Sequence, residues 1–135
     1  MKKAWVAAVL FISAAGPVYS NDAQVEEYAR MAAAGANEFF KKSPPSDGVT
    51  VSSRAYSAGK AVVYENVLAI RSNVTDAELA IWRSGTRSEV VPATCSMLKR
   101  DPFFKKGLYF RYIYLSRRGE VLDDFVVNRP ACSGL

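Results

Sequence analysis

Histidine is absent from this chain, so the commonest general base at neutral pH and the commonest metal ligand are both missing. Serine is plentiful, but no GxSxG motif surrounds any serine, and no histidine exists to activate one. Cysteine occurs only twice, without the CxxC spacing of thiol-exchange enzymes. No loop gathers the carboxylates that a metal site would need. The sequence therefore predicts a protein with no enzymatic activity, no metal site and no cofactor.

The neighbouring carboxylates Asp123 and Asp124 raise the question of glycoside hydrolysis, which needs two facing carboxylates at a defined separation. Neighbours on a strand point to opposite faces of the sheet, so this pair cannot supply that geometry. We expect at least one of the two to form an ion pair with an arginine.

A long apolar run is also missing. The run at 4–15 follows two lysines, ends at a Gly-Pro pair and is too short to span a bilayer. Val18 and Ser20 are small residues at the −3 and −1 positions of a cleavage site before Asn21. We therefore expect residues 1–20 to be a signal peptide and residues 21–135 to form a single periplasmic or secreted domain without a transmembrane segment.

Export decides how the only two cysteines, Cys95 and Cys132, are interpreted. In an oxidising compartment two cysteines of a small domain predict a disulfide, and a catalytic thiol or half a metal site is disfavoured. The bond would close a loop of roughly 37 residues and stabilise the fold by about 4 kcal/mol.

The remaining pattern predicts an α+β fold in which an N-terminal helix and a central helical segment pack on a four-stranded, mainly antiparallel sheet. An apolar stripe at three-to-four spacing indicates a helix over 21–42. A capping box, Thr75 to Glu78, starts a second helix. Ser84-Gly85 is expected to interrupt that helix, and a second capping box, Thr86 to Glu89, to restart it. The order is α-β-β-α-β-β, with strands expected at 49–56, 61–71, 108–115 and 121–128.

Two glycine-containing turns are expected to join the strands into hairpins, at 57–60 and at 117–119. In the second strand, alternation gives two candidate faces. We expect the inward face to carry Val62, Tyr64, Leu68 and Ile70. The third strand is apolar on both faces, which is typical of a covered central strand or of an aromatic binding face.

A basic segment before the third strand interleaves four cations with two phenylalanines, and it is the main candidate for function. The cations could bind an acidic protein or an anionic envelope surface, or they could be a solvated rim around phenylalanines that fold inward. Nucleic acid is disfavoured by export and by a net charge of only about +3 once the first 20 residues are removed. The candidate partner-binding residues are Lys99, Arg100, Phe103, Phe104, Lys105, Lys106, Tyr109 and Arg111.

This region also carries a family resemblance. The region runs from Cys95 through MLKR at 97–100, GLYFRY at 107–112 and RGEV at 118–121 to Cys132. This layout resembles that of small exported bacterial α+β domains such as the Vibrio-type pilotins of type II secretion. The resemblance implies a disulfide that closes over a final hairpin and a role in binding a partner protein to guide its assembly. The chain departs from pilotins in lacking their lipidated N-terminal cysteine.

Together these features lead us to expect a non-enzymatic, exported protein-binding module, an accessory of a bacterial envelope or secretion machine, with a protein as its partner. The alternative is an inhibitor or immunity protein that acts on a toxin or a cell-wall enzyme, since such proteins are also small, exported and closed by a disulfide.

Overall fold

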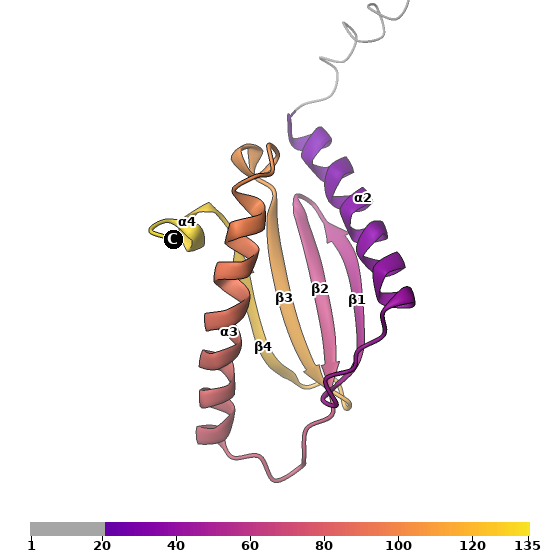
Figure 1. The fold of residues 1–135 in the computed structure, drawn as a ribbon, viewed down its shortest axis with the longest axis vertical. Coiled ribbons are helices and arrows are strands. Elements are labelled where there is room, and N and C mark those ends of the chain that lie inside the picture. Colours follow the sequence, from indigo (N-terminus) through magenta and orange to yellow (C-terminus); the bar gives the residue numbers. More distant parts are fainter. Residues whose placement is uncertain (1–20) are drawn as a thin grey trace, which may run out of the picture.

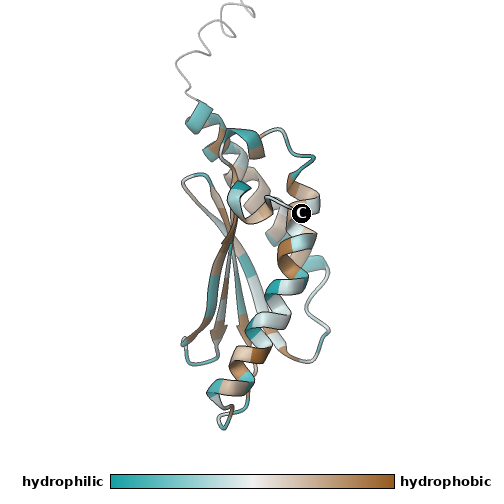
Figure 2. Cartoon of the chain, turned by 90° about the vertical axis from the view of Figure 1, so that its left-hand side faces the viewer, coloured by the Kyte–Doolittle hydropathy of each residue, from teal (hydrophilic) through white to brown (hydrophobic). Residues whose placement is uncertain are grey.

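Two long helices lie on one face of a four-stranded sheet in the computed structural model, which describes residues 21–135 (Figures 1 and 2). The predicted signal peptide lies outside the described residues. Helix α2 (Asn21–Lys42) packs on one half of the sheet and α3 (Asp76–Leu98) on the other. The α+β class and the expected element order are confirmed. The strands are β1 (Thr50–Ala58), β2 (Ala61–Leu68), β3 (Tyr109–Ser116) and β4 (Val121–Val127), and the short helices are η2 (Phe104–Lys106) and α4 (Arg129–Cys132).

The sheet has the spatial order β1-β2-β3-β4 and is mainly antiparallel, as predicted. The hairpins β1–β2 and β3–β4 are antiparallel, whereas β2 and β3 are parallel and joined by the crossover through α3. Both hairpin turns use a glycine with positive φ, Gly59 at 57° and Gly119 at 84°. The glycines allow the left-handed conformation that tight hairpins require.

Helix α2 ends at the predicted residue, Lys42, and the chain is helical from the first described residue, Asn21. It buries Val25, Ala29 and Ala33, and the small alanines let the helix approach β1 closely. The side chain of Asn37, on α2, links the helix to β1 by two hydrogen bonds. Its Nδ2 donates to the carbonyl of Ala55 and its Oδ1 accepts from the Ala55 amide, both at 2.7 Å. Both main-chain groups of a buried strand residue are therefore satisfied.

Helix α3 starts with the predicted capping box. The Thr75 hydroxyl accepts from the Glu78 amide at 3.1 Å, and the Glu78 carboxylate accepts from the Thr75 amide at 2.8 Å. The predicted interruption at Ser84-Gly85 is wrong, because the helix runs unbroken to Leu98 and contains Pro92. The second capping box, at Thr86, is also wrong, since that residue lies in the middle of the helix.

The helix is continuous because tertiary contacts hold both of its halves on the sheet. Arg83 and Arg87 bond to β4, and the C-terminal half buries Cys95 and Leu98. An interior glycine costs only about 1 kcal/mol relative to alanine, which such contacts readily offset.

The faces of β2 differ in part from the expectation. Val62 and Leu68 are buried, and Tyr64 packs against the core below the helices. Ile70 is not inward, because β2 ends at Leu68 and Ile70 is 36% exposed beyond it. Val63, on the opposite face, is also buried, in a small cluster that contains no helical residue.

The predicted disulfide is confirmed. Cys95 and Cys132 are bonded, with their Cα atoms 5.5 Å apart, and both are almost fully buried. The bond joins the last turns of α3 to α4, which follows β4 directly. The position of α3 on the sheet is thus fixed by a covalent link near its C-terminal end.

Candidate functional site

A row of aromatic rings crosses the sheet from α2 to α3. Neighbouring ring centroids along this row lie 5.4–6.2 Å apart, within the range of favourable aromatic pairs. All the rings are half-buried except the buried Phe125. We call this feature the aromatic row, and in spatial order it consists of Phe40, Tyr64, Tyr112, Phe125, Tyr114 and Trp82.

Strand register produces the centre of the row. Tyr64 of β2 is paired with Tyr112 of β3, and Tyr112 is paired with Phe125 of β4. Paired residues on adjacent strands point to the same face, so the three rings stack side by side. The interplanar angles are 16° for the first pair and 25° for the second.

The helices flank the row. Because α2 packs mainly on β1 and α3 packs on β4, the central strands β2 and β3 run between the two helices (Figure 1). Phe40, in the last turn of α2, meets Tyr64 edge-on at 6.2 Å. Trp82, near the start of α3, meets Tyr114 edge-on at 5.4 Å. Each helix therefore supplies one end of the row.

The hydroxyls of the row differ in their partners. The Tyr112 hydroxyl is hydrogen-bonded to Thr94 of α3 at 2.6 Å. Within residues 21–135 the hydroxyls of Tyr64 and Tyr114 have no hydrogen-bond partner, and no fully buried side-chain polar atom there is unsatisfied. Those two hydroxyls consequently reach solvent. They are available to a ligand that binds over the row.

Burial keeps these phenols neutral. It raises the pKa of Tyr64, and it is the main cause that raises the pKa of Tyr112 and of Tyr114 to about 12. Since these raised pKa values lie far above neutral pH, the hydroxyls of Tyr64 and Tyr114 remain protonated donors under physiological conditions. The row is thus an apolar surface with fixed hydrogen-bond donors.

An ion pair between Arg87 and Asp123 holds α3 on the sheet beside the row. The Arg87 guanidinium donates to both carboxylate oxygens of Asp123, at 2.9 and 2.5 Å, and lies 4.9 Å from the centre of the Phe125 ring. The hydrogen bonds from Arg87 hold the pKa of Asp123 below its usual value. On the other face of the sheet, Asp124 binds Arg111 at 2.8 and 2.6 Å. Both acids pair with an arginine, as expected for at least one.

The predicted basic segment forms the loop between α3 and β3, at the far end of the sheet from the β3–β4 turn (Figure 1). Its cations Lys99, Arg100, Lys105 and Lys106 are exposed. Phe104 is buried in the core, and Phe103 stacks on Tyr28 of α2 with centroids 4.4 Å apart.

Tyr109 and Arg111 lie elsewhere. They belong to the face of the sheet that no helix of the described residues covers (Figure 2), in or beside the cluster around Ala61, Val63 and Ile113. The structure therefore gathers the six other candidate residues in one loop and places Tyr109 and Arg111 on the open face of the sheet, opposite the aromatic row.

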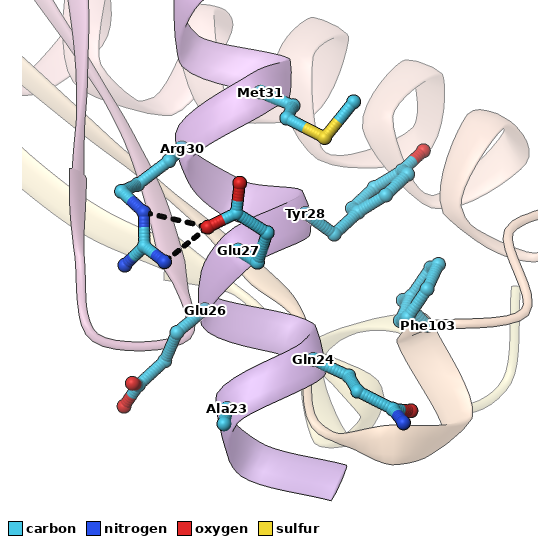
Figure 3. A pocket seen from close by; sticks show the side chains of 8 residues that line it. All are labelled: Ala23, Gln24, Glu26, Glu27, Tyr28, Arg30, Met31 and Phe103. Atoms are coloured by element: carbon cyan, nitrogen blue, oxygen red, sulfur yellow. Dashed lines mark hydrogen bonds and ion pairs between the residues drawn. The ribbon is translucent and has the colours of Figure 1, made fainter. Parts of the chain in front are cut away.

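A pocket of about 490 Å³ lies on the outer side of α2 (Figure 3). Tyr28 and Phe103 form one wall, and Met31 and the ion-paired Arg30 and Glu27 line the rest. The hydrogen bond from the Tyr28 hydroxyl to Asp101, 2.6 Å long, fixes this wall and is the main cause that raises the pKa of Tyr28 to about 12.

Sequence reasoning missed the aromatic row. The signal was present, because Phe110, Tyr112 and Tyr114 alternate along one strand. Since the residues between them are also apolar, the alternation could not show which face lies below the helices. No group of three metal-ligating side chains occurs among the described residues, and none of their helices is long and apolar enough to cross a bilayer.

The fold is similar to those of solved secretion proteins. The pilotin EpsS from the Vibrio vulnificus type 2 secretion system aligns with a TM-score of 0.62 at 17% identity, covering 85% of this chain and 97% of the pilotin. The type II secretion system pilotin AspS from Vibrio cholerae aligns with a TM-score of 0.49 at 18% identity, covering 82% and 97%. No family model and no curated protein matches the chain. The predicted resemblance to pilotins is confirmed at the level of the fold.

Proposed function

We propose that this chain is an exported, non-enzymatic protein-binding module that serves as an accessory of a bacterial secretion machine. The observation that carries the proposal is the aromatic row, which lies half-buried between α2 and α3. Tyrosine and tryptophan are enriched in protein interfaces because they combine a large apolar area with a polar tip. A partner segment laid over the row would bury Tyr64 and Tyr114 and accept hydrogen bonds from their hydroxyls.

The fold supports the secretion part of this proposal. The chain shares it with a pilotin of a type 2 secretion system, and pilotins bind a partner protein to guide its assembly. The disulfide supports export, because such bonds persist in oxidising compartments. At 17% identity the likeness does not transfer individual residues, so the role of the aromatic row depends on the geometry of this chain alone.

Site-specific cross-linking tests where the partner binds. A photo-reactive phenylalanine at Tyr64 should cross-link, in the native envelope, to a component of a secretion machine. The matched control is the same group at Tyr56, a half-buried tyrosine on the opposite face of the sheet. Equal cross-linking at both positions would contradict binding over the row. A toxin or cell-wall hydrolase as the captured protein would support the inhibitor alternative.

Affinity then tests the energetic role of the row. With the captured partner purified, Tyr64→Ala should raise Kd about 30-fold or more if the ring is a central contact. Tyr64→Phe, which keeps the ring but loses the hydroxyl donor, should raise Kd by only about fivefold, and Tyr56→Ala should leave Kd unchanged. Melting curves of each variant separate lost binding from lost folding.

A further inference from the structure

We propose that the loop at residues 99–106 docks this protein onto an anionic lipid surface by binding phosphate headgroups. The loop carries the cations Lys99, Arg100, Lys105 and Lys106 and the single acid Asp101. This site is separate from the aromatic row and does not depend on the function proposed for the row.

The loop contains the whole net charge of residues 21–135. Removing Lys2 and Lys3 from the 18 basic residues leaves 16 against 13 acids, a net charge of +3. The loop has four cations and one acid, which is also +3, so the other described residues carry equal numbers of each sign. The excess of positive over negative charge in residues 21–135 thus equals the charge of this loop, which lies at one end of the sheet (Figure 1).

The loop cations form no side-chain ion pair within residues 21–135. Asp101, the one acid of the loop, is turned inward. It accepts hydrogen bonds from the Tyr28 hydroxyl at 2.6 Å and from the Phe103 amide at 2.9 Å. Lys99 donates to the main-chain oxygen of Leu135, whereas the side chains of Arg100, Lys105 and Lys106 form no hydrogen bond or ion pair within residues 21–135.

The loop is also fixed in shape. Phe104 is buried, Phe103 stacks on Tyr28, and Lys106 Nζ lies 5.3 Å from the centre of the Phe103 ring. Gly107 ends the turn with φ at 107°. A charged loop held by a buried anchor binds with little further loss of conformational entropy, because its backbone is already ordered.

Exposed apolar side chains beside the cations favour a lipid surface over an acidic protein. Met97 is 52% exposed and lines a pocket together with Arg100. Met31 is 64% exposed and lines the pocket on the other side of Tyr28, where Glu27 is paired with Arg30 (Figure 3). A membrane interface accepts both features together, with phosphates facing the cations and the methionine tips at the acyl boundary.

Vesicle co-sedimentation tests the proposal, with the same N-terminus in every preparation. The protein should bind vesicles of phosphatidylethanolamine and phosphatidylglycerol, bind phosphatidylcholine vesicles poorly, and be released by salt. Each surface cation contributes about fivefold to the partition coefficient, so Lys105→Gln/Lys106→Gln should lower it about 30-fold. The matched control, Arg117→Gln/Arg118→Gln, removes the same charge at the exposed β3–β4 turn and should change the coefficient far less.

Three results would overturn the proposal. The first is equal binding to both kinds of vesicle, and the second is an equal loss in the control variant, which would show a response to net charge alone. The third is loss of partner capture in the lysine variant while the wild type does not bind lipid, which would assign the loop to an acidic protein. Unchanged Tyr64 cross-linking in the lysine variant would show that the two surfaces act independently.

Discussion

Reduction of the disulfide should release the C-terminal part of α3 and lower the stability of the whole domain. The Cys95–Cys132 bond closes a loop with a sequence separation of 37. In the chain-entropy description, a loop of that length stabilises the folded state by about 4 kcal/mol. For a chain of this size each kcal/mol shifts Tm by about 4 °C, so the reduced protein should melt about 15 °C lower.

The chain contains its own reporter for this experiment. Trp82 is the only tryptophan of residues 21–135, and its indole packs edge-on against Tyr114. Thermal unfolding followed by circular dichroism and by Trp82 fluorescence, with and without reductant, measures the effect on the sheet and on α3 separately. The Cys95→Ala/Cys132→Ala variant should melt near the reduced wild type and should not respond to reductant. Coincident melting of oxidised and reduced wild type would refute the reasoning.

Three further changes test local features by denaturant or thermal unfolding. Thr75→Ala should cost about 1 kcal/mol through loss of the cap, whereas Thr86→Ala, inside the same helix, should cost nothing. The folded state lowers the pKa of Asp123, so its ion pair stabilises the fold above about pH 4 and that contribution is lost on further acidification. Asp123→Asn should therefore flatten this part of the plot of unfolding free energy against pH. Gly107→Ala, at a φ of 107°, should destabilise by about 1 kcal/mol or more, while Gly35→Ala, in an open position of α2, should stabilise by up to about 1 kcal/mol. A stabilising Gly107→Ala would show that the turn can rearrange.

Elements defined by neighbouring residues were predictable from the sequence. The C-terminal end of α2, the cap at Thr75 and the turn at Gly119 each depend on a few adjacent side chains, and all three were confirmed. The disulfide was predictable because only one pairing of two cysteines exists.

Features that depend on distant contacts were not predictable in the same way. Ser84 and Gly85 weaken a helix locally, but Arg87 and the buried end of α3 keep it whole through contacts with strands about 36 residues away in sequence. The face of β3 that lies below the helices was equally hidden. Tyr109 and Tyr112 both fit an apolar alternation, and only the packing of the helices on one face of the sheet decides which of them faces the core.

The disulfide connects the two proposed surfaces physically. The chain between Cys95 and Cys132 contains the cationic loop and also Tyr112, Tyr114 and Phe125, the β3 and β4 members of the aromatic row. One covalent ring therefore carries the loop and half of the aromatic row, and its closure holds α3, with Trp82, beside the row. An oxidised ring orders both surfaces before any partner or lipid arrives, which lowers the entropy cost of binding at each. We infer that oxidation strengthens binding at both surfaces as well as stabilising the fold.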